Sequence, residues 1–549
     1  MQLIECVPNF SEGNDLNIIR QITDEIEKVE GVRLLNVDPG KATNRTVVTM
    51  VGEPARVIEA AFYCIKKAGE LIDMSKHKGE HPRMGATDVC PLIPIANISM
   101  EETAKYAQQL AKRVGEELKI PVYLYEAAQP NKERSNLSVI RAGEYEGFFK
   151  KIKEPQWKPD FGPAEFDAKR GGTVIGARDF LVAYNVNLNT TSTRRANAIA
   201  FDVREAGRNI DVDGKKVNQP GTLKSVKAIG WFIEEYGVAQ ISMNLTNINV
   251  TPVHIAFDEV CTRATARGVR VTGSELVGLI PLKAMLDAGK YFLQKQKRST
   301  GVSEKELIKI AIKSMGLDEL GPFKPEERII EYMLADKANS RLVNMKLTDF
   351  ADETASESPA PGGGSISAYV GALGISLGTM VANLSSHKKG WDDRWKEFSD
   401  WAEKGEYFKN ELIKLVDADT LAFNKIMQAF GLPKATEEEK KTRKQAIQEA
   451  TKFAIEIPFR VMETAYESMA VIKQMVIEGN PNSVTDAGVG ALCARSAVIG
   501  ACMNVRINAT GYDDKVFVND IVARAKAIEA KAIALEAEII GLVNEKIGV

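Results

Sequence analysis

The sequence predicts an α+β N-terminal half, made of two ferredoxin-like α/β sandwich subdomains, followed by an all-α helical bundle. The chain has 549 residues, which is too long for one hydrophobic core, so several domains are expected. In the first half, short apolar runs alternate with amphipathic stretches, whereas long stretches with helical spacing dominate after about Leu334. These patterns predict subdomains at 1–179 and 180–335, a linker at 336–343 and a helical domain at 344–549.

The first subdomain opens with apolar runs of strand length that are separated by helix-like stretches. Helices are expected at Leu16–Val29, from Pro54 to about Met74 and from Met100, because Pro54 suits a first helical position and Ser99 a cap. The expected strands are Gln2–Val7, Val32–Val37, Thr46–Val51, Val89–Ile95 and Val122–Tyr125. This order approximates a ferredoxin-like sandwich with extra elements.

The second subdomain repeats a similar order from about Phe180. The expected elements are a strand at Phe180–Leu188, a helix from about Thr191 to Gly207, strands at Val226–Glu234 and Ala239–Ile248, a helix from about Val253 and a strand near Val269–Ile280. This β-α-β-β-α-β order is typical of the split-βαβ fold. We therefore expect two sandwiches that face each other across a cleft.

A polar stretch at 335–343 (ADKANSRLV) has the composition of a linker, and long helical runs follow it. The last of them, Lys515–Ile547, is rich in Ala, Glu, Lys and Ile, with apolar residues at helical spacing. These runs predict the helical bundle.

One helical run, Ile366–Leu384, is uncharged and nearly long enough to cross a bilayer. Gly374, Gly378 and Ala382 recur in it every four positions, which lets helix backbones approach closely. A second such segment is not expected, because Ala487–Val505 carries Arg495. We therefore expect a buried bundle helix and no membrane partner.

Charge and composition argue against several classes of protein. The 72 Lys and Arg residues balance 74 Asp and Glu residues, and no basic stripe with interleaved aromatic residues is present, so a nucleic-acid partner is not expected. The beginning of the sequence, MQLIECVPNF, lacks the basic and apolar regions of a secretion signal. The six cysteines are scattered without a CxxC pair, as expected for reduced thiols in the cytoplasm.

Histidine is scarce, so any imidazole chemistry near neutral pH must use one of four residues: His77, His81, His254 and His387. Two of them lie in a polar turn, His77–Asp88 (HKGEHPRMGATD), between an expected helix and an expected strand. The turn matches the HxxEH string of a class of zinc proteases, but that motif needs a continuous helix, which Gly79 and Pro82 disfavour. No metal is therefore expected, and a solvated loop histidine is the plainer alternative.

The neighbouring strand suggests a function for this turn. Asp38 follows the expected strand Val32–Val37, and a carboxylate there can fix the tautomer of a loop histidine and raise its basicity. Four long strings around these residues resemble glutamate formiminotransferase, and the resemblance spans roughly residues 1–335: ECVPNFSEG (5–13), NVDPGKATNRTVVTMVG (36–52), GEHPRMGATDVCPLIPI (79–95) and DFGPAEFDAKRGGTVIGARDFLVAYNVNL (160–188).

The resemblance implies residue functions. His81 matches the general base of that family, and Asp38 matches the aspartate held near it. The folate-contacting segment falls on Gly162, Pro163, Ala164, Glu165, Phe166, Asp167, Ala168, Lys169, Arg170 and Gly171, although AEFDAKR is divergent. Guanidinium groups suit the carboxylates of the glutamate substrate, and Arg45, Arg83 and Arg178 are candidates by position, although each also suits a surface arginine.

The C-terminal half contains two candidate features. In SPAPGGGS (358–365), Gly362, Gly363 and Gly364 permit a backbone turn over a ligand, with an ordinary interhelical loop as the alternative. Asp419 lies on an apolar stripe that runs from Leu412 to Ile426, whereas Asp417 points about 160–200° away from it. A carboxylate on such a stripe is desolvated, which suits proton transfer, and a structural ion pair is the alternative.

Further strings resemble formiminotetrahydrofolate cyclodeaminase over roughly residues 344–549: SPAPGGGSISAYVGALG (358–374), VDADTLAFNKIMQAFGLPK (416–434) and NPNSVTDAGVGALCARSAVIGACMNVRIN (480–508). Asp419 falls on the aspartate that this family treats as catalytic. Both resemblances in one chain imply a bifunctional enzyme of histidine degradation. It would move a formimino group from formiminoglutamate to tetrahydrofolate and then release ammonia, in a homo-oligomer such as the octameric ring of fused family members. A glutamate formyltransferase whose C-terminal half is a binding or oligomerisation module is the alternative.

Overall fold

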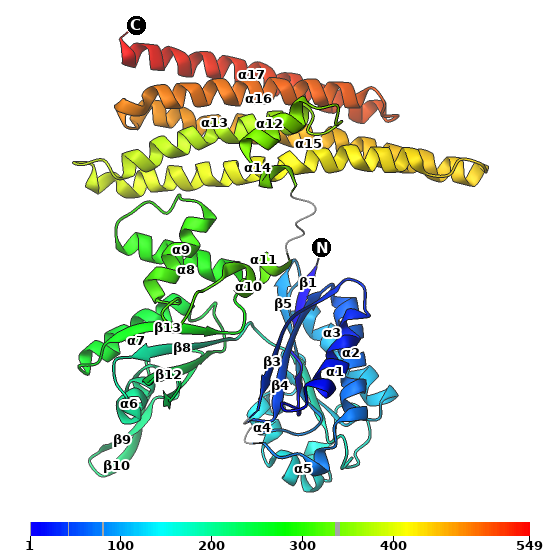
Figure 1. The fold of residues 1–549 in the computed structure, drawn as a ribbon, viewed down its shortest axis with the longest axis vertical. Helices are drawn as coiled ribbons and strands as arrows, with labels where there is room; N and C mark the ends of the chain where they lie inside the picture. The colour runs from blue at the N-terminus through cyan, green and yellow to red at the C-terminus, as the bar shows by residue number, and fades with distance from the viewer. Residues whose placement is uncertain (1, 42, 80–81, 335–340, 549) are drawn as a thin grey trace. The chain divides into compact units, whose positions relative to one another are not determined.

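The computed structural model describes residues 2–41, 43–79, 82–334 and 341–548. They form two compact units (Figure 1). The sheet unit contains Met1–Ala284 and Met315–Leu334, and the helical unit contains Met285–Ser314 and Ala335–Val549. The predicted fold class is confirmed, because the strands lie in the first unit and long helices make up the second.

A seven-stranded mixed sheet forms the first part of the sheet unit. Its strands are β1 (Leu3–Cys6), β2 (Asn9–Phe10), β3 (Val32–Gly40), β4 (Arg45–Gly52), β5 (Thr87–Ala96), β6 (Val122–Glu126) and β7 (Thr173–Ala177). The sequence did not predict β7, which lies between β5 and β6 and runs parallel to both. The strand β3 continues three residues beyond its predicted end, because Asp38–Gly40 pair with Arg45–Val47.

Helices cover one face of this sheet. They are α1 (Leu16–Glu27), α2 (Pro54–Leu71) and α3 (Met100–Glu117), and their apolar faces form one core with alternate strand residues such as Ile4, Cys6 and Leu92. The sequence explains where they begin: Asp15 caps α1, Pro54 begins α2, and Ser99 with Glu102 forms a capping box on α3. Two short helices, α4 (Leu137–Arg141) and α5 (Glu144–Lys151), contribute Ile140 and Phe148 to a second cluster.

The second sheet has the order β11-β12-β8-β13, which is that of the ferredoxin-like fold. Its elements are β8 (Val182–Leu188), α6 (Thr193–Val203), β11 (Val226–Ile233), β12 (Val238–Leu245), α7 (Val253–Ala266) and β13 (Val271–Val277). The helix α6 ends four residues before the predicted end, and an unpredicted hairpin of β9 (Arg208–Val212) and β10 (Lys215–Gln219) follows. The short helices α10 (Pro325–Arg328) and α11 (Ile330–Leu334) complete the unit.

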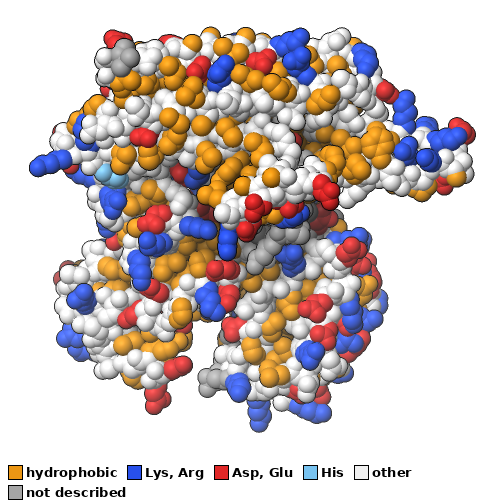
Figure 2. Space-filling view, turned by 45° about the horizontal axis from the view of Figure 1, so that its top comes forward, with side chains coloured by type: hydrophobic (Ala, Val, Ile, Leu, Met, Phe, Trp, Pro, Cys, Tyr) orange, Lys and Arg blue, Asp and Glu red, His pale blue; other side chains and the backbone are white. Residues whose placement is uncertain are grey.

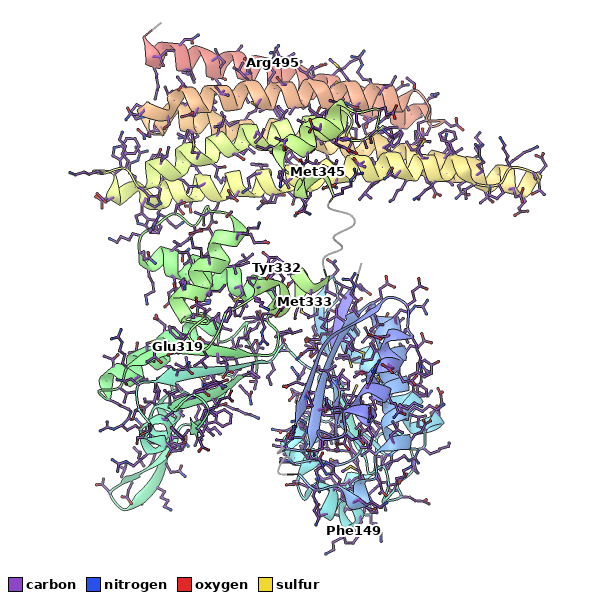
Figure 3. The ribbon with its side chains drawn as sticks, in the orientation of Figure 1. Phe149, Glu319, Tyr332, Met333, Met345 and Arg495 are labelled. Carbon is purple, nitrogen blue, oxygen red and sulfur yellow. The ribbon has the colours of Figure 1, made fainter. Side chains whose placement is uncertain are left out.

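The second sheet also carries a buried polar network that the sequence analysis did not identify. Asn187 donates to Glu319 (2.5 Å) and accepts from Gln240 (2.8 Å). Glu319 is labelled in Figure 3. Asn187 and Gln240 are both fully buried, so each depends on these partners for hydrogen bonding.

The helical unit is a bundle of long helices. They are α12 (Leu347–Ala355), α13 (Gly363–Ser386), α14 (Trp395–Gly431), α15 (Glu437–Glu478), α16 (Val484–Ala509) and α17 (Lys515–Ile547). Most residues of two further helices, α8 (Leu282–Lys295) and α9 (Glu304–Met315), belong to the same unit. Part of the predicted linker, residues 336–340, lies outside the described residues.

Within the described chain, two helices are long and apolar enough to cross a membrane, α13 and the segment Pro481–Ala509. The expectation of only one was therefore wrong: a single charged side chain, Arg495, does not remove α16 from this class. Arg495 extends toward Glu536 of α17 at 3.7 Å (Figure 3). The apolar windows of the two segments are 61% and 50% buried, as expected for core helices of a bundle.

Candidate active sites

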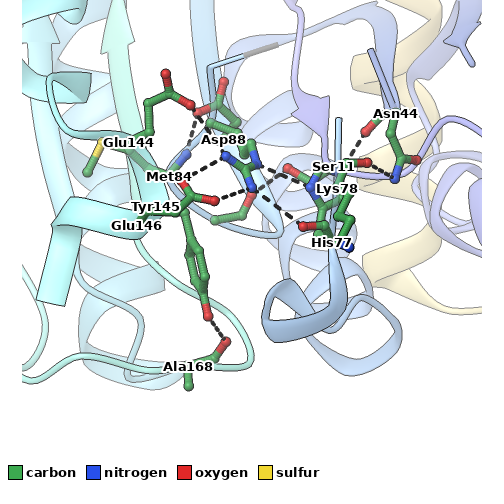
Figure 4. A network of polar contacts seen from close by, with 12 residues as sticks. Ser11, Asn44, His77, Lys78, Met84, Asp88, Glu144, Tyr145, Glu146 and Ala168 are labelled. Atoms are coloured by element: carbon green, nitrogen blue, oxygen red, sulfur yellow. Dashed lines mark hydrogen bonds and ion pairs between the residues drawn. The ribbon is translucent and has the colours of Figure 1, made fainter. Parts of the chain in front are cut away.

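The loop between α2 and β5 carries the polar turn (Figure 4). Its described residues from His77 to Gly79 are not helical, whereas Glu80 and His81 lie outside the described residues. The His77 Nε2–H donates to the Asn44 carbonyl (2.9 Å), and its Nδ1 accepts from Arg83 Nε (3.2 Å). His77 therefore uses both ring nitrogens to hold the turn against the loop that contains Asn44.

Arg83, a candidate for substrate binding, is only 7% exposed. Its guanidinium forms ion pairs with Glu146 (2.6 Å) and Glu144 (3.3 Å) of α5 (Figure 4). The hydrogen bonds that Arg83 donates to Glu146, together with its positive charge, lower the pKa of this carboxyl group. Arg83 thus connects the turn to α5 through ion pairs. Its contact with the substrate stays a prediction.

Asp88 supports the same turn from inside the unit. It is fully buried, and its carboxylate accepts hydrogen bonds from the Met84 N–H (3.0 Å) and from Arg141 (2.6 Å). Burial raises the pKa of Asp88, while Arg141 and Arg45 oppose this shift. Burial likewise lowers the pKa of Arg45 to about 10, which the charge of Asp88 opposes. Arg45, another candidate for substrate binding, is thus part of a buried group of charges.

Asp38 lies inside β3 rather than after its end, and its side chain is exposed. It pairs with Val47 of β4, two residues from Arg45. The loop between β3 and β4 contains Asn44, which accepts from His77 and donates to the Lys78 carbonyl (2.8 Å). The fold therefore brings the β3–β4 connection next to the turn that carries His81.

The predicted folate segment, residues 162–171, forms backbone hydrogen bonds just before this turn and near its C-terminal end. The Met74 N–H donates to the Lys169 carbonyl (2.9 Å), and the Ala86 N–H donates to the Arg170 carbonyl (2.8 Å). Asp167 and Arg170 form an ion pair at 2.6 Å, and Phe166 lies 5.5 Å from the ring of Tyr145. The exposed residues of the segment include Ala164, Glu165 and Ala168.

Arg178 follows β7 and lies beside a residue that the sequence analysis missed. Glu5 of β1 is 3% exposed, and burial raises its pKa to about 7, an effect that Arg178 opposes. The alternation Ile4, Glu5, Cys6 places Glu5 on the sheet face opposite the helices, because Ile4 and Cys6 belong to the helix-covered core. A charged residue between two buried apolar residues of a strand was the signal available in the sequence.

The catalytic candidate of the helical unit, Asp419, reaches the first turn of α13. Its Oδ2 accepts from the Ser365 N–H (2.9 Å) and from the Ser365 hydroxyl (3.2 Å). A Cβ on Gly364 would overlap the Asp419 carboxylate, and one on Gly363 would lie 3.1 Å from Asn504 of α16. The glycines therefore let α13 begin directly against α14 and α16.

The environment of Asp419 suits an acid–base group. Burial raises the pKa of Asp419, and the hydrogen bonds from Ser365 oppose this shift. The side chain is half-buried, so the carboxyl is withdrawn from bulk water without being sealed from it. Sequence spacing also separated Asp419 from Asp417, but Asp417 does not face solvent: it is 8% exposed and accepts the N–H groups of Leu342 (2.8 Å) and Val343 (3.2 Å).

Comparison with known families covers nearly the whole chain. Residues 3–178 match the formiminotransferase domain, N-terminal subdomain; residues 183–335 match the formiminotransferase domain; and residues 346–527 match formiminotransferase-cyclodeaminase. Formimidoyltransferase-cyclodeaminase of Gallus gallus is 44% identical over 94% of both chains.

Relatives of each half are also known. Glutamate formimidoyltransferase of Thermoplasma acidophilum is 45% identical over 54% of this chain and 93% of its own. Methenyltetrahydrofolate cyclohydrolase of Methylorubrum extorquens is 37% identical over 34% of this chain and 88% of its own. The resemblance stated from the sequence is confirmed, and the chain belongs to the formimidoyltransferase-cyclodeaminase family.

Proposed function

We propose that this protein is a bifunctional folate enzyme. It transfers the formimino group of N-formimino-L-glutamate to tetrahydrofolate and then converts 5-formiminotetrahydrofolate to 5,10-methenyltetrahydrofolate and ammonia. The observation that carries the proposal is the partly buried carboxylate of Asp419 against Gly364 and Ser365, in a chain that matches a bifunctional relative over 94% of both chains. Tetrahydrofolate is a co-substrate.

In the transfer step, N5 of tetrahydrofolate attacks the formimino carbon and becomes positively charged. We assign His81 as the base that takes this proton and returns it to the departing glutamate amine, because imidazole has a suitable pKa. Asp38 would orient that imidazole and stabilise its charged form. Of the three arginines predicted to bind the substrate carboxylates, Arg83 forms ion pairs with Glu146 and Glu144, Arg45 lies in a buried group of charges with Asp88, and Arg178 donates to the Asp179 carbonyl.

In the second step, N10 attacks the formimino carbon, a five-membered ring closes and the nitrogen leaves as ammonia. One proton must therefore move from N10 to the leaving nitrogen. Asp419 suits this transfer, because its raised pKa lets the carboxyl both accept and donate a proton. Its carboxylate form also stabilises the positive charge that the amidine carbon carries. Neither step requires a metal.

Replacement of Asp419 by asparagine tests the assignment. Asp419→Asn should lower the rate of methenyltetrahydrofolate formation by about two to four orders of magnitude, the usual contribution of a general acid–base group. The variant should still transfer the formimino group, and the release of glutamate measures this transfer. Asp417→Asn serves as the matched control, since this carboxylate holds the backbone of Leu342 and Val343 and should affect stability instead. Unchanged ammonia release by Asp419→Asn would refute the assignment.

The same assays separate the alternative function. A formyl donor releases no ammonia, and a C-terminal half that only binds or assembles forms no methenyltetrahydrofolate. Ammonia release from formiminoglutamate with tetrahydrofolate, lost in Asp419→Asn, therefore supports the bifunctional enzyme over a formyltransferase.

We also propose that the enzyme is a cytoplasmic homo-oligomer without membrane or nucleic-acid partners. Hydrophobic side chains lie exposed on the helical unit (Figure 2). Those of α13 and α16 are 37% to 65% exposed and would suit a contact with a second copy: Leu373, Met380, Leu384, Val489, Leu492, Met503 and Ile507. Light scattering of the purified chain measures its oligomeric state, and a monomer would overturn this part.

A further inference from the structure

Glu5 is a buried charged residue of the sheet unit to which the proposed reaction steps assign no function. Only 3% of the residue is exposed, and among the described residues it makes no hydrogen bond and no ion pair within 4 Å. A buried carboxylate without such partners opposes folding, because desolvation disfavours its charged form. Burial accordingly raises its pKa to about 7. The charged form of Glu5 therefore destabilises the folded protein, which points to a function in ligand binding.

The strand neighbours of Glu5 are apolar, and the charged group that acts on it is the Arg178 guanidinium. Glu5 pairs with Val51 of β4 and with Ile93 of β5, in the middle of the sheet and on the face opposite α1, α2 and α3, where Val51 packs against Leu279 and against Ile330 of α11. Arg178 lies near enough to lower its pKa, yet its guanidinium donates to the Asp179 carbonyl (2.9 Å) rather than to Glu5. A planar ligand edge placed here would meet two acceptor oxygens of Glu5 and, beside them, the donors of Arg178.

We propose that Glu5, with Arg178 beside it, recognises the 2-amino-4-oxopyrimidine edge of the folate pterin. That edge presents two donors, the 2-amino group and N3–H, next to one acceptor, the 4-oxo oxygen. A carboxylate accepts the donor pair in a bidentate, charge-assisted arrangement, and a guanidinium donates to the oxygen. The proposal deepens the proposed transferase function and rests on it for the identity of the ligand.

The formimino group of formiminoglutamate is also planar and presents two N–H donors, so it could in principle bind Glu5. The register of the strands favours the pterin instead. Asp38 pairs with Val47, whereas Glu5 pairs with Val51, so the two carboxylates lie four strand positions apart, about 13 Å along β4. Asp38 lies at the end of the sheet where the reacting N5 is expected. The donor's formimino carbon must join N5 there, whereas the pyrimidine edge is the far side of the bicyclic ring.

The test compares tetrahydrofolate with its 2-desamino-2-methyl analogue in the transferase reaction of the full chain. Wild type should prefer tetrahydrofolate by about ten- to a hundredfold in KM, the range for losing a hydrogen bond to a charged group. Glu5→Gln should raise the KM for tetrahydrofolate by a similar factor, abolish the preference and leave the KM for formiminoglutamate unchanged. Glu126→Gln is the matched control, because Glu126 is a second carboxylate near Arg178 and should alter neither KM.

Two results would overturn the proposal. If the Glu5→Gln protein still prefers the 2-amino compound, the carboxylate of Glu5 has only a structural function. If only the KM for formiminoglutamate rises, Glu5 binds formiminoglutamate and not the pterin. Glu5→Asp keeps the charge but shortens the side chain by one methylene group, so it should also raise the KM for tetrahydrofolate. This variant replaces Glu5→Gln in the test if Glu5→Gln does not fold. If wild type transfers no formimino group, the transferase function fails, and calorimetric binding of 5-formyltetrahydrofolate to wild type and Glu5→Gln still decides for or against pterin recognition.

Discussion

Gly364 shows at the scale of one residue how a missing side chain can place a reactive one. The Asp419 carboxylate occupies the space that a Cβ on Gly364 would need. Gly364→Ala should therefore displace the carboxylate or separate α13 from α14, and a displacement of about 1 Å lowers rates on the order of a hundredfold.

The rate of methenyltetrahydrofolate formation measures this effect. Gly431→Ala is the matched control, since no heavy atom lies within 4 Å of a Cβ at that position of α14. A Gly364→Ala protein with the activity of wild type would contradict the close packing of Asp419 against α13.

Glu5 gives a second prediction at this scale, for stability in the absence of folate. Its pKa is raised from 4.5 to about 7, so between these values the native protein binds a proton that the unfolded chain does not. Stability therefore falls as pH rises through this window. Glu5→Gln, which stays neutral, should be more stable than wild type at pH 8 by up to about 3 kcal/mol and similar to it near pH 4.

Calorimetric melting at both pH values checks the sign. Glu30→Gln, at an exposed position, should shift the transition little at either pH. A Glu5→Gln protein less stable than wild type at pH 8 would show that the carboxylate is stabilised when charged. The expected combination of higher stability and weaker folate binding is typical of residues kept for function.

At the scale of the element, two helices of the bundle approach through glycine. A Cβ on Gly374 of α13 would lie 2.8 Å from the Gly490 carbonyl of α16 and 3.0 Å from the Cβ of Cys493. Gly374→Ala should therefore destabilise the helical unit by about 1–3 kcal/mol, as overpacking does.

Thermal unfolding of the helical unit measures this difference. The comparison is Gly541→Ala in α17, where a Cβ would meet nothing within 4 Å. That substitution should stabilise the protein by up to about 1 kcal/mol, because glycine is unfavourable inside a helix. If both substitutions shifted stability in the same direction, the close approach of α13 and α16 would be in doubt.

Elements with a strong local pattern were predictable from the sequence, and elements defined by distant partners were not. The helix α17 has the predicted bounds, Lys515–Ile547, because periodicity and the Asp514 cap are local. The strand β7 was missed, since five residues after two glycines form a strand only through pairing with β5 and β6. Asp419 was separated from Asp417 by helical spacing alone, but the burial of Asp417 depends on Leu342 and Val343, more than 70 residues away.

At the scale of the whole molecule, the two proposed sites lie in different compact units of one chain. Asp38 and the turn that carries His81 belong to the sheet unit, and Asp419 belongs to the helical unit. Each reaction should therefore be removable without the other. His81→Ala should abolish the transfer of the formimino group and leave the conversion of added 5-formiminotetrahydrofolate, with Asp419→Asn showing the reverse.

Mixing the two variants tests whether a released intermediate connects the sites. The mixture should form methenyltetrahydrofolate from formiminoglutamate and tetrahydrofolate, after a lag in which 5-formiminotetrahydrofolate accumulates in solution. Wild type at equal concentration of active sites should show a shorter lag, because fusion raises the local concentration of the intermediate at the second site. Absorbance of methenyltetrahydrofolate follows both reactions. If the mixture forms no methenyltetrahydrofolate while each variant keeps its own half-reaction, the intermediate does not leave the protein. If the mixture and wild type show equal lags, fusion gives no kinetic advantage.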